Sequence, residues 1–457
     1  VNFDEIKSFY KESPRSFQNK RPINIAMTAI YKRLNNHKEM LFHLEKVINS
    51  GDFISNDLCI YGYWRCFDKG WSQKEFFEYG KFVDKNLIEY SKDKLTKLSN
   101  EKNKKIKLGI LSADLKAGHS ITYFLKTILL NYNKKEIEIY LFSNQIDDKV
   151  ISPEITNLVY KTINIGKLSE LIALNKIREF NLDIMIDVMG YTSRNRIGLF
   201  KNRIAKKQII WMGYCNTSGL KNMDYIISDP NLIMPDEQKL YAEKVIYLPQ
   251  IWNCHSGFHF ERIEHPAPLK KNNYFTFGSF NNLDKVNSDV IELWSNILKQ
   301  VKNSKLILKS GKQYHSFKRV MDLFKKNNVL DSIVFLEKKK KLADHLDTYK
   351  SIDLALDTYP YNGVTTSFEA IWMGVPVLTM AGYNFNSRCG ESINKNLGIE
   401  NLIAKSSEEY VLRAVDLANN QDKFLKLRKL VYRNALNTPL FDAQKFSKNF
   451  YNYLKKL

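Results

Sequence analysis

From about residue 105 onward, short apolar segments alternate with longer amphipathic ones, and this alternation constrains the fold more than any other feature of the chain. The apolar segments have the length of β-strands, and several stretches between them carry apolar residues at helical spacing. A chain that alternates strands and helices in this way forms parallel sheets with helices on both faces. The sequence therefore predicts an α/β protein.

The strand candidates form two series, separated by a Pro- and Lys-containing segment around 264–273. The first series comprises 106–113, 136–144, 182–190, 208–214, 223–228 and 244–249. The second comprises 275–281, 304–310, 332–337, 352–358 and 375–380. Two such series predict two Rossmann-like domains that face each other across a cleft. Ligands of these sheets bind at the carboxyl ends of strands, so chemistry is expected in the loops that follow them.

The first hundred residues differ from the rest, because their apolar positions recur at helical spacing without convincing strand-like alternation. A charged stretch rich in Ser, Asn and Lys follows at 91–105 and is expected to be a linker. We predict three parts: a small all-α N-terminal region with its linker (1–104), a first Rossmann-like domain (105–262), and a second one (263–457) whose last helix packs back across the joint.

The composition excludes a mainly disordered chain, because 44% of the 457 residues are hydrophobic. No run approaches the roughly 20 apolar residues of a membrane-spanning helix, and the first residues lack the layout of a secretory signal. The five cysteines are scattered and no C-x-x-C occurs, which argues against a disulfide framework or a zinc ribbon. We expect a soluble protein of a reducing compartment, the cytoplasm, with no membrane span.

The net charge of +21 raises the question of a nucleic-acid partner. Lysines are spread through every segment, often beside Asn, and the one compact basic block is 338–341. The motifs typical of nucleic-acid-binding folds do not occur, so no nucleic-acid role is expected. A basic surface equally suits an acidic partner or an anionic small molecule.

The most informative segment is 352–380, which predicts a strand, a loop, a helix, a turn and a second strand. The loop carries Asn362 and Gly363, and Thr365 and Thr366 follow at the start of the helix. Free N–H groups and the helix dipole make such a start an anion site suited to a diphosphate.

Glu369 lies one turn into the same helix and is placed to accept hydrogen bonds from a ribose. The pattern Thr366-x-x-Glu369 is equally that of a capping box, which needs no ligand. Both interpretations use the same helix terminus, and spacing alone does not separate them.

A second segment, 275–294, places Asn282 and Lys285 between a strand and a helix expected to begin at Asn287 or Ser288. A lysine there can place a point charge on a departing phosphate. In so Lys-rich a chain, Lys285 taken alone is more often a solvated loop residue.

Two histidines lie near expected strand ends. In segment 107–125, His119 precedes a helix and could orient or deprotonate an acceptor in the cleft, or simply cap that helix. His345 lies on an expected helix shortly before the strand at Ile352, where a structural role is the common outcome.

These segments, taken in order with DVMGYTSRNRIGLF, QIIWMGYCNTSGLKNMDYIISD and YPYNGVTTSFEAIWMGVPVLTMAG, resemble the O-GlcNAc transferase/SPINDLY family of glycosyltransferases, family 41. The resemblance runs from about residue 105 to the C-terminus. It implies a GT-B fold with the acceptor on the first Rossmann-like domain and the nucleotide sugar mostly on the second.

The resemblance also implies roles for single residues. Lys285 would neutralise the leaving diphosphate, and His119 would lie near the acceptor and the sugar. Thr192 would belong to a loop at the reaction centre. The implied donor-binding residues are Asn282 (phosphates or nucleotide), His345 (nucleoside), Asn362 and Gly363 (loop), Thr365 and Thr366 (diphosphate) and Glu369 (ribose).

Three features depart from the family pattern. Val364 stands where relatives have a histidine or glycine, so only backbone contacts to phosphate are expected there. The spacing from Asp114 to His119 is one residue longer than usual, which affects the placement of His119. The chain also shows no long helical-repeat array, the part that binds protein acceptors in relatives.

The resemblance implies an inverting, metal-independent transferase without a cofactor that moves a sugar to Ser or Thr hydroxyls of a protein. UDP-GlcNAc is the default donor, and GDP-fucose or another sugar on a bacterial surface or flagellar protein are the alternatives. N-linked transfer to Asn and a GT-B scaffold that has lost catalysis are further alternatives. Acceptor recognition could rest on residues 1–90, on a homodimer or on the cleft alone.

Overall fold

The computed structural model describes residues 3–90, 105–258, 260, 262–310 and 314–457, so the predicted linker lies outside the described residues except for Lys105. Two compact units are present. Unit 1 combines Val1–Trp71, Glu264–Ala381 and Asn401–Arg428, and unit 2 combines Ser72–Ile263, Gly382–Glu400 and Lys429–Leu457. The chain passes between them five times. The contiguous domain ranges given above stay a prediction, because packing alone does not establish which ranges fold independently.

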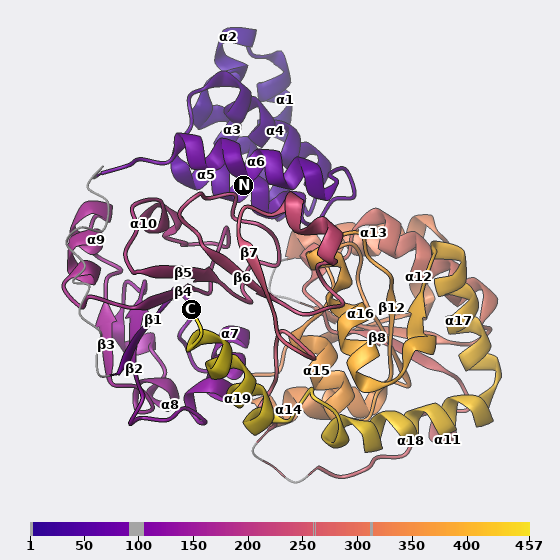
Figure 1. The fold of residues 1–457 in the computed structure, drawn as a ribbon. Helices are drawn as coiled ribbons and strands as arrows, with labels where there is room; N and C mark the ends of the chain where they lie inside the picture. Colours follow the sequence, from indigo (N-terminus) through magenta and orange to yellow (C-terminus); the bar gives the residue numbers. More distant parts are fainter. Residues whose placement is uncertain (1–2, 91–104, 259, 261, 311–313) are drawn as a thin grey trace. The chain divides into compact units, whose positions relative to one another are not determined.

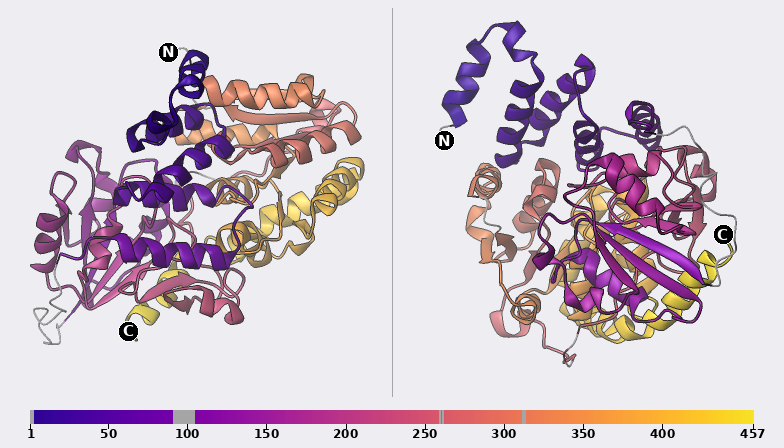
Figure 2. Two further views of the ribbon diagram at one scale, coloured as in Figure 1. Left: turned by 90° about the horizontal axis from the view of Figure 1, so that it is seen from above. Right: turned by 90° about the vertical axis from the view of Figure 1, so that its left-hand side faces the viewer.

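Unit 2 is built on a seven-stranded parallel sheet in the order β3-β2-β1-β4-β5-β6-β7. The strands lie side by side in Figure 1 and in the right view of Figure 2. All six strands predicted for this part are confirmed, whereas β3 was missed because Ile163 is its one large apolar residue. The strands are β1 (Ile106–Ser112), β2 (Ile137–Ser143), β3 (Lys161–Asn164), β4 (Ile184–Asp187), β5 (Lys207–Ile210), β6 (Tyr225–Ser228) and β7 (Lys244–Tyr247).

Helices complete unit 2, and the C-terminal one packs beside α7 (Figure 1). In that contact the hydroxyl of Tyr451 donates to the carbonyl of Ile128 at 3.0 Å. The helices are α6 (Gln73–Asn86), α7 (Ser120–Leu129), η1 (Asp148–Val150), α8 (Pro153–Thr156), α9 (Glu170–Arg178), α10 (Ile197–Lys201), η2 (Pro235–Leu240), α16 (Phe385–Leu397) and α19 (Ala443–Leu454). A further helix, α18 (Gln421–Asn437), begins in unit 1 and ends in unit 2.

Unit 1 contains a six-stranded parallel sheet in the order β10-β9-β8-β11-β12-β13. The five strands predicted from the second series are confirmed, whereas β13 is only two residues long and was missed. The strands are β8 (Thr276–Ser279), β9 (Lys305–Ser310), β10 (Ile333–Glu337), β11 (Leu354–Leu356), β12 (Val377–Met380) and β13 (Ile403–Ala404).

The helical N-terminal region is also confirmed, but it divides between the two units. Its first five helices belong to unit 1, while α6 packs on unit 2 at Gly80, where an added Cβ would lie 2.7 Å from the Cα of Gly219. The five are α1 (Phe3–Glu12), α2 (Arg15–Gln18), α3 (Arg21–Arg33), α4 (His37–Ser50) and α5 (Ser55–Arg65).

Longer helices and short 3-10 turns surround the sheet of unit 1, and α12 packs against α17 (Figure 1). They are α11 (Leu269–Asn272), η3 (Leu283–Lys285), α12 (Ser288–Gln300), α13 (Tyr314–Lys326), η4 (Leu330–Ser332), α14 (Leu342–Asp347), η5 (Thr348–Ser351), α15 (Thr365–Trp372), η6 (Glu400–Leu402) and α17 (Ser407–Asn419).

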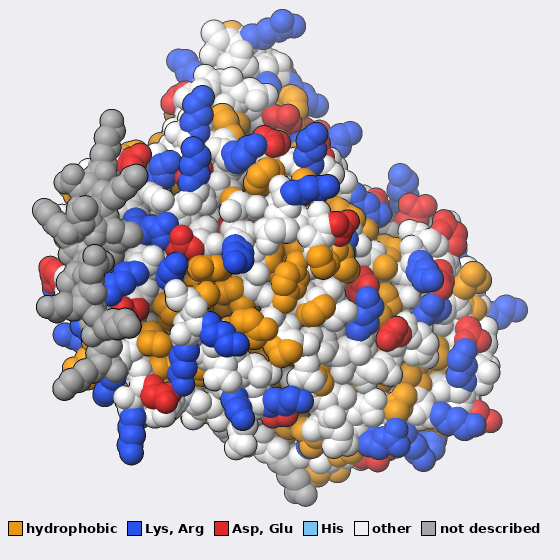
Figure 3. All heavy atoms as spheres, in the orientation of Figure 1, with side chains coloured by type: hydrophobic (Ala, Val, Ile, Leu, Met, Phe, Trp, Pro, Cys, Tyr) orange, Lys and Arg blue, Asp and Glu red, His pale blue; other side chains and the backbone are white. Residues whose placement is uncertain are grey.

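The charged side chains are dispersed. On the face seen in Figure 3, Lys and Arg are interspersed with Asp and Glu, and no block of one sign covers that face. The Lys and Arg side chains of this face are thus solvated and mixed with carboxylates. Within the described ranges, no helix is both long enough and apolar enough to cross a membrane.

Candidate functional site

The candidate site of unit 1 lies where the strand order of its sheet reverses. Starting from β8, the chain proceeds outward through β9 and β10 and then returns to the other side of β8 as β11. Ligands bind at the carboxyl ends of strands beside such a reversal. A pocket of about 250 Å³ lies there. It is lined by Ser279, Phe280, Asn281, Tyr349, Ile352, Ala355, Leu356, Asp357, Thr366, Ser367 and Val377.

The first turn of α15 leaves backbone N–H groups available beside this pocket. The N–H groups of Val364, Thr365 and Thr366 make no hydrogen bond to any described residue. The next two, of Ser367 and Phe368, each bond to the carbonyl of Val364 at 3.0 Å. Unpaired N–H groups at the positive end of a helix bind anions, so this terminus has the chemistry of a phosphate site.

The alternative of a capping box is wrong. Thr366 lies inside the helix, and its hydroxyl donates to Oδ1 of Asn281 at 3.0 Å. Glu369 reaches away from the terminus and contacts Nε2 of His345 at 3.0 Å and the hydroxyl of Tyr349 at 2.9 Å. Neither side chain caps the helix.

A buried carboxylate fixes the loop before α15. Oδ1 of Asp357 accepts hydrogen bonds from the N–H of Thr358 at 2.9 Å and of Gly363 at 2.7 Å, and Oδ2 accepts from the hydroxyl of Thr379 at 2.8 Å. Burial raises the pKa of Asp357 to about 6. The hydrogen bonds oppose this rise, because they favour the ionised carboxylate. Asp357 was not predicted from the sequence, although its position at the carboxyl end of the strand predicted at 352–358 is a signal.

Asn362 and Gly363 shape this loop. The amide of Asn362 is buried and donates to the carbonyl of Thr358 at 2.9 Å. A Cβ on Gly363 would lie 2.5 Å from Oγ1 of Thr366 and 2.8 Å from Oδ1 of Asn281. The close approach of these groups leaves no room for a side chain at Gly363.

Lys285 is half-buried and contacts the same loop. Its Nζ donates to the carbonyl of Asn362 at 2.7 Å and lies 4.2 Å from the centre of the Tyr361 ring. Asn282 caps the short turn that carries Lys285, accepting from the N–H of Asp284 at 3.3 Å. The ammonium is therefore held at the carbonyl of Asn362, three residues before the start of α15, and is not a freely solvated loop charge.

The helix after Lys285 begins as the sequence predicted. It starts at Ser288, and the side chain of Asn287 accepts from the N–H of Val290 at 2.9 Å.

His345 belongs to a series of polar side chains that contact Glu369 of α15. Its Nε2 contacts Glu369, and its Nδ1 lies 3.2 Å from Nζ of Lys309. With the ring proton assigned to Nε2, the ring donates to the carboxylate and accepts from the ammonium. Burial lowers the pKa of Lys309, while Glu369 opposes that shift. Lys309 and Tyr349 were missed, because only the fold brings them to His345.

In unit 2 the strand order reverses between β1 and β4, and His119 follows β1. It is the N-cap of α7, as the alternative from sequence held, because its Nδ1 accepts from the N–H of Ile121 at 3.4 Å. Its Nε2 lies 3.7 Å from Oδ1 of Asp114, which also pairs with Arg194 at 3.1 Å. Burial lowers the pKa of His119 and so favours the neutral ring, while the charge of Asp114 opposes that shift.

Thr192 lies in the loop after β4. Its hydroxyl donates to the carbonyl of Met189 at 2.8 Å. Buried Asp187 supports this turn by accepting from the N–H groups of Met189 and Gly190, each at 2.9 Å. Burial raises the pKa of Asp187 to about 7.

The predicted residues thus gather in two places. Lys285 and all the predicted donor-binding residues lie around the strand reversal of unit 1, while His119 and Thr192 lie at the reversal of unit 2. In the part of the chain that the structure describes, no three His, Cys, Asp or Glu side chains are grouped as metal ligands would be.

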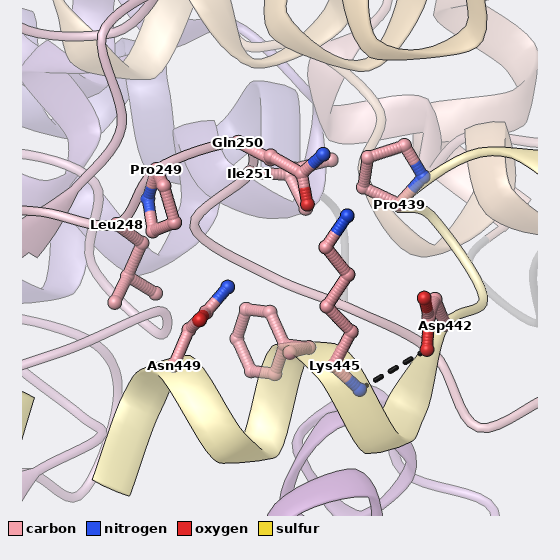
Figure 4. A pocket seen from close by; sticks show the side chains of 9 residues that line it. Leu248, Pro249, Gln250, Ile251, Pro439, Asp442, Lys445 and Asn449 are labelled. Atoms are coloured by element: carbon pink, nitrogen blue, oxygen red, sulfur yellow. Dashed lines mark hydrogen bonds between the residues drawn. The ribbon is translucent and has the colours of Figure 1, made fainter. Parts of the chain in front are cut away.

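Unit 2 holds a further pocket of about 240 Å³ between the loop after β7 and α19 (Figure 4). Leu248, Ile251 and Phe446 supply its buried apolar lining, and its charged residues, Asp442 and Lys445, are exposed. No buried charged group lines this pocket, so it lacks the buried polar and charged groups that surround the pocket of unit 1.

The chain resembles known glycosyltransferases both in sequence and in fold. The family model described as Glycosyl transferase family 41 matches residues 78–273 and 261–450. The chain is 31% identical over 343 residues to a protein of Solanum lycopersicum named probable UDP-N-acetylglucosamine–peptide N-acetylglucosaminyltransferase SPINDLY, with 72% of this chain and 36% of that protein covered. It is 26% identical over 356 residues to the similarly named SEC protein of Arabidopsis thaliana, with 76% and 36% covered. The chain thus spans just over a third of the length of these two relatives.

Among solved structures, an O-GlcNAc transferase mutant of Thermobaculum terrenum has a TM-score of 0.87 at 21% identity, with 96% of this chain and 84% of that chain covered. The likeness shows the fold. It confirms the expected GT-B class, with two Rossmann-like domains after a helical N-terminal region.

Proposed function

Since the chain belongs to glycosyl transferase family 41, we propose that it is an enzyme that transfers a sugar from a nucleoside diphosphate to a protein. The proposed donor is UDP-GlcNAc and the proposed acceptor a Ser or Thr hydroxyl. The names of the two relatives, which pair UDP-N-acetylglucosamine with a peptide, support this donor and a peptide acceptor.

One observation carries the proposal: the ammonium of Lys285 and the first turn of α15 meet at a single loop, through the carbonyl of Asn362. The N–H groups of that turn and the hydroxyl of Thr365 would hold the diphosphate, and the hydroxyl of Thr366 would join them by exchanging its acceptor, Asn281, for a phosphate oxygen. Lys285 would then oppose the charge that develops when the bond from the anomeric carbon to the diphosphate oxygen breaks.

In the proposed reaction the acceptor hydroxyl oxygen attacks the anomeric carbon from the face opposite the diphosphate, and the bond from that carbon to the diphosphate oxygen breaks. The configuration is inverted, the bond electrons leave with the diphosphate, and the hydroxyl proton is released to solvent water. The positive charge that the leaving group requires would come from Lys285 and the helix terminus, without a metal ion. Glu369, oriented by His345 and Tyr349, is proposed to accept from the ribose hydroxyls.

His119 is proposed to orient the acceptor rather than to take its proton. With Nδ1 accepting from the N–H of Ile121, the neutral ring carries its proton on Nε2 and retains no free lone pair. A ring in that state donates a hydrogen bond and does not act as a base.

The test compares Lys285→Ala with Lys299→Ala, an exposed lysine on α12. Lys285→Ala should lower kcat by roughly 100-fold or more while the circular dichroism spectrum and Tm stay the same, since a charge is lost where the leaving group forms. Turnover is measured as the release of nucleoside diphosphate from UDP-GlcNAc and, separately, from GDP-fucose. The sugar nucleotide that the wild type consumes is the donor. Near-normal turnover by Lys285→Ala would refute the role of Lys285.

A wild type that neither binds a nucleotide nor consumes a donor would overturn the proposed activity itself, not only the role of Lys285. If neither UDP nor GDP raises its Tm and neither donor is consumed, the chain is a scaffold without catalysis, because a ligand that binds only the folded state must raise Tm.

A further inference from the structure

The helical segment that precedes Trp71 contacts the loop that carries the proposed phosphate-binding groups. Phe67 follows α5 and is buried, and its ring centre lies 4.5 Å from that of Tyr361 at an interplanar angle of 32°. Tyr63 approaches the same ring edge-on, at 6.3 Å. The ring of Tyr361 is also the one that lies 4.2 Å from Nζ of Lys285. An aromatic ring of the helical segment therefore supports the ring on which the ammonium rests.

A second contact holds the backbone of the turn that carries Lys285. The side-chain amide of Asn35 is completely buried and donates to the carbonyl of Leu283 at 3.1 Å. Leu283 is the first residue of η3, and Lys285 is its last. Asn35 has a φ of +52°, in the left-handed region that Asn tolerates, and its own carbonyl accepts from Arg319 of α13.

A third contact joins the helical segment to both loops at once. Nζ of Lys69 pairs with Oδ2 of Asp289 at 3.0 Å, at the start of the helix after Lys285. It also lies 5.3 Å from the ring centre of Tyr359, in the loop before α15. The helical segment thus contacts the loop before α15, the turn η3 and the start of α12, and all of these contacts lie within unit 1.

We propose that Phe67 and Asn35 are positioning residues for Lys285, and that the helical segment is therefore a working part of the donor site; this rests on the proposed role of Lys285. A lysine side chain has several rotatable bonds, and a charge misplaced by about 1 Å stabilises a transition state much less. Phe67 limits the orientation of the Tyr361 ring, and Asn35 limits the position of η3. Together they hold the ammonium against the carbonyl of Asn362.

The first experiment measures kcat and KM, from the release of nucleoside diphosphate, for two variants. Phe67→Leu keeps an apolar side chain but removes the ring, and Asn35→Gly keeps the left-handed backbone but removes the amide. Each should lower kcat about tenfold, the scale of a lost pairwise interaction. Phe67→Tyr should restore most of kcat because it restores the ring. If kcat is unchanged in both Phe67→Leu and Asn35→Gly, the inference is wrong.

Tyr10→Leu is the matched control. Tyr10 is a buried aromatic residue of the same segment, and its ring contacts His43 at 5.0 Å rather than either loop. This variant should lower Tm while kcat stays within about twofold of the wild type. If it lowers kcat as much as Phe67→Leu does, the segment acts through stability alone and the inference fails.

A double-mutant cycle tests whether Phe67 acts through Lys285. Calorimetry gives the Kd of UDP or GDP, whichever the wild type binds, with and without Phe67→Leu in the wild-type and Lys285→Ala backgrounds. Phe67→Leu should weaken binding severalfold in the first background and less than about twofold in the second. Equal weakening in both contradicts the inference and leaves the proposed function standing. A wild type that binds neither nucleotide overturns both.

Discussion

Asp357 lies beneath the loop that joins β11 to α15, and all three groups around its carboxylate are hydrogen-bond donors. An amide at this position would place an NH₂ group, itself a donor, against either the N–H groups of Thr358 and Gly363 or the hydroxyl of Thr379. The donors on that side would then have no acceptor. Asp357→Asn should therefore loosen the loop at Gly363 and weaken binding of the nucleoside diphosphate roughly tenfold, because an unsatisfied buried donor costs about 1–3 kcal/mol.

Calorimetric titration with UDP and GDP checks this expectation. Asp331→Asn is the matched control, since Asp331 is exposed in η4 of the same unit. Unchanged affinity in Asp357→Asn would mean that the loop keeps its shape without the carboxylate.

Spacing and the family resemblance predicted the residues of the candidate site but not their partners. The pattern Thr366-x-x-Glu369 fits two structures equally, and the choice between them depends on Asn281, His345 and Tyr349. Those residues come from other elements and reach this helix only in the fold. For the same reason, neither Asp357 nor Phe67 could be assigned a supporting role from its neighbours in the chain.

The helix α4 is the element whose stability should depend most clearly on pH. Burial, aided by Arg319 and Lys32, lowers the pKa of His37 from 6.5 to about 4. Burial also lowers that of His43 to about 4. The folded state therefore favours neutral rings, and the unfolded state binds more protons between pH 6.5 and 4. Their contribution to stability is complete above pH 6.5 and is lost as the pH falls toward 4.

This predicts that the free energy of unfolding falls between pH 7 and pH 5, with a contribution from His37 of roughly 1–3 kcal/mol. His37→Phe keeps the ring contacts with Trp64 and Phe67 and removes the titrating group. Hydrogen exchange of the α3–α5 amides at both pH values should show a smaller change in His37→Phe than in the wild type. An equal change in both proteins would assign the effect to other groups.

Elements with a strong pattern were predictable, and those without one were not. Central parallel strands are buried on both faces and appear as apolar runs, so the eleven predicted strands are found. The four residues Lys161–Asn164 form an edge strand with little apolar content, and Ile403–Ala404 is too short to carry a period. Helical spacing located α6 but could not indicate that it packs on unit 2 while α1–α5 belong to unit 1.

At the scale of the whole molecule, the discontinuous units predict the behaviour of fragments. The ring of Trp211, which is 1% exposed, lies 4.7 Å from that of Phe450 in α19. A fragment of residues 105–262 lacks α19 and would expose Trp211 and the face of α7. It should show no cooperative thermal transition, because it loses much of the apolar burial on which unit 2 depends.

Differential scanning calorimetry of that fragment, beside the full chain, checks this. Co-expression of 1–262 with 263–457 is the control and should restore a cooperative transition. If 105–262 alone melts near the Tm of the full chain, the contiguous domain range is a folding unit after all.

The five passages of the chain between the units also set an order of events on the ribosome. Residues up to Trp71 emerge first, yet the sheet with which they form unit 1 follows only from Glu264, and the last segment of that unit ends at Arg428. At the usual 5–20 residues per second, the interval between Trp71 and Arg428 is roughly 20–70 s. Until residues from Glu264 onward emerge, the first helices have no partner from the sheet of unit 1, so nascent chains of this protein should depend on chaperones more than a protein of contiguous domains does.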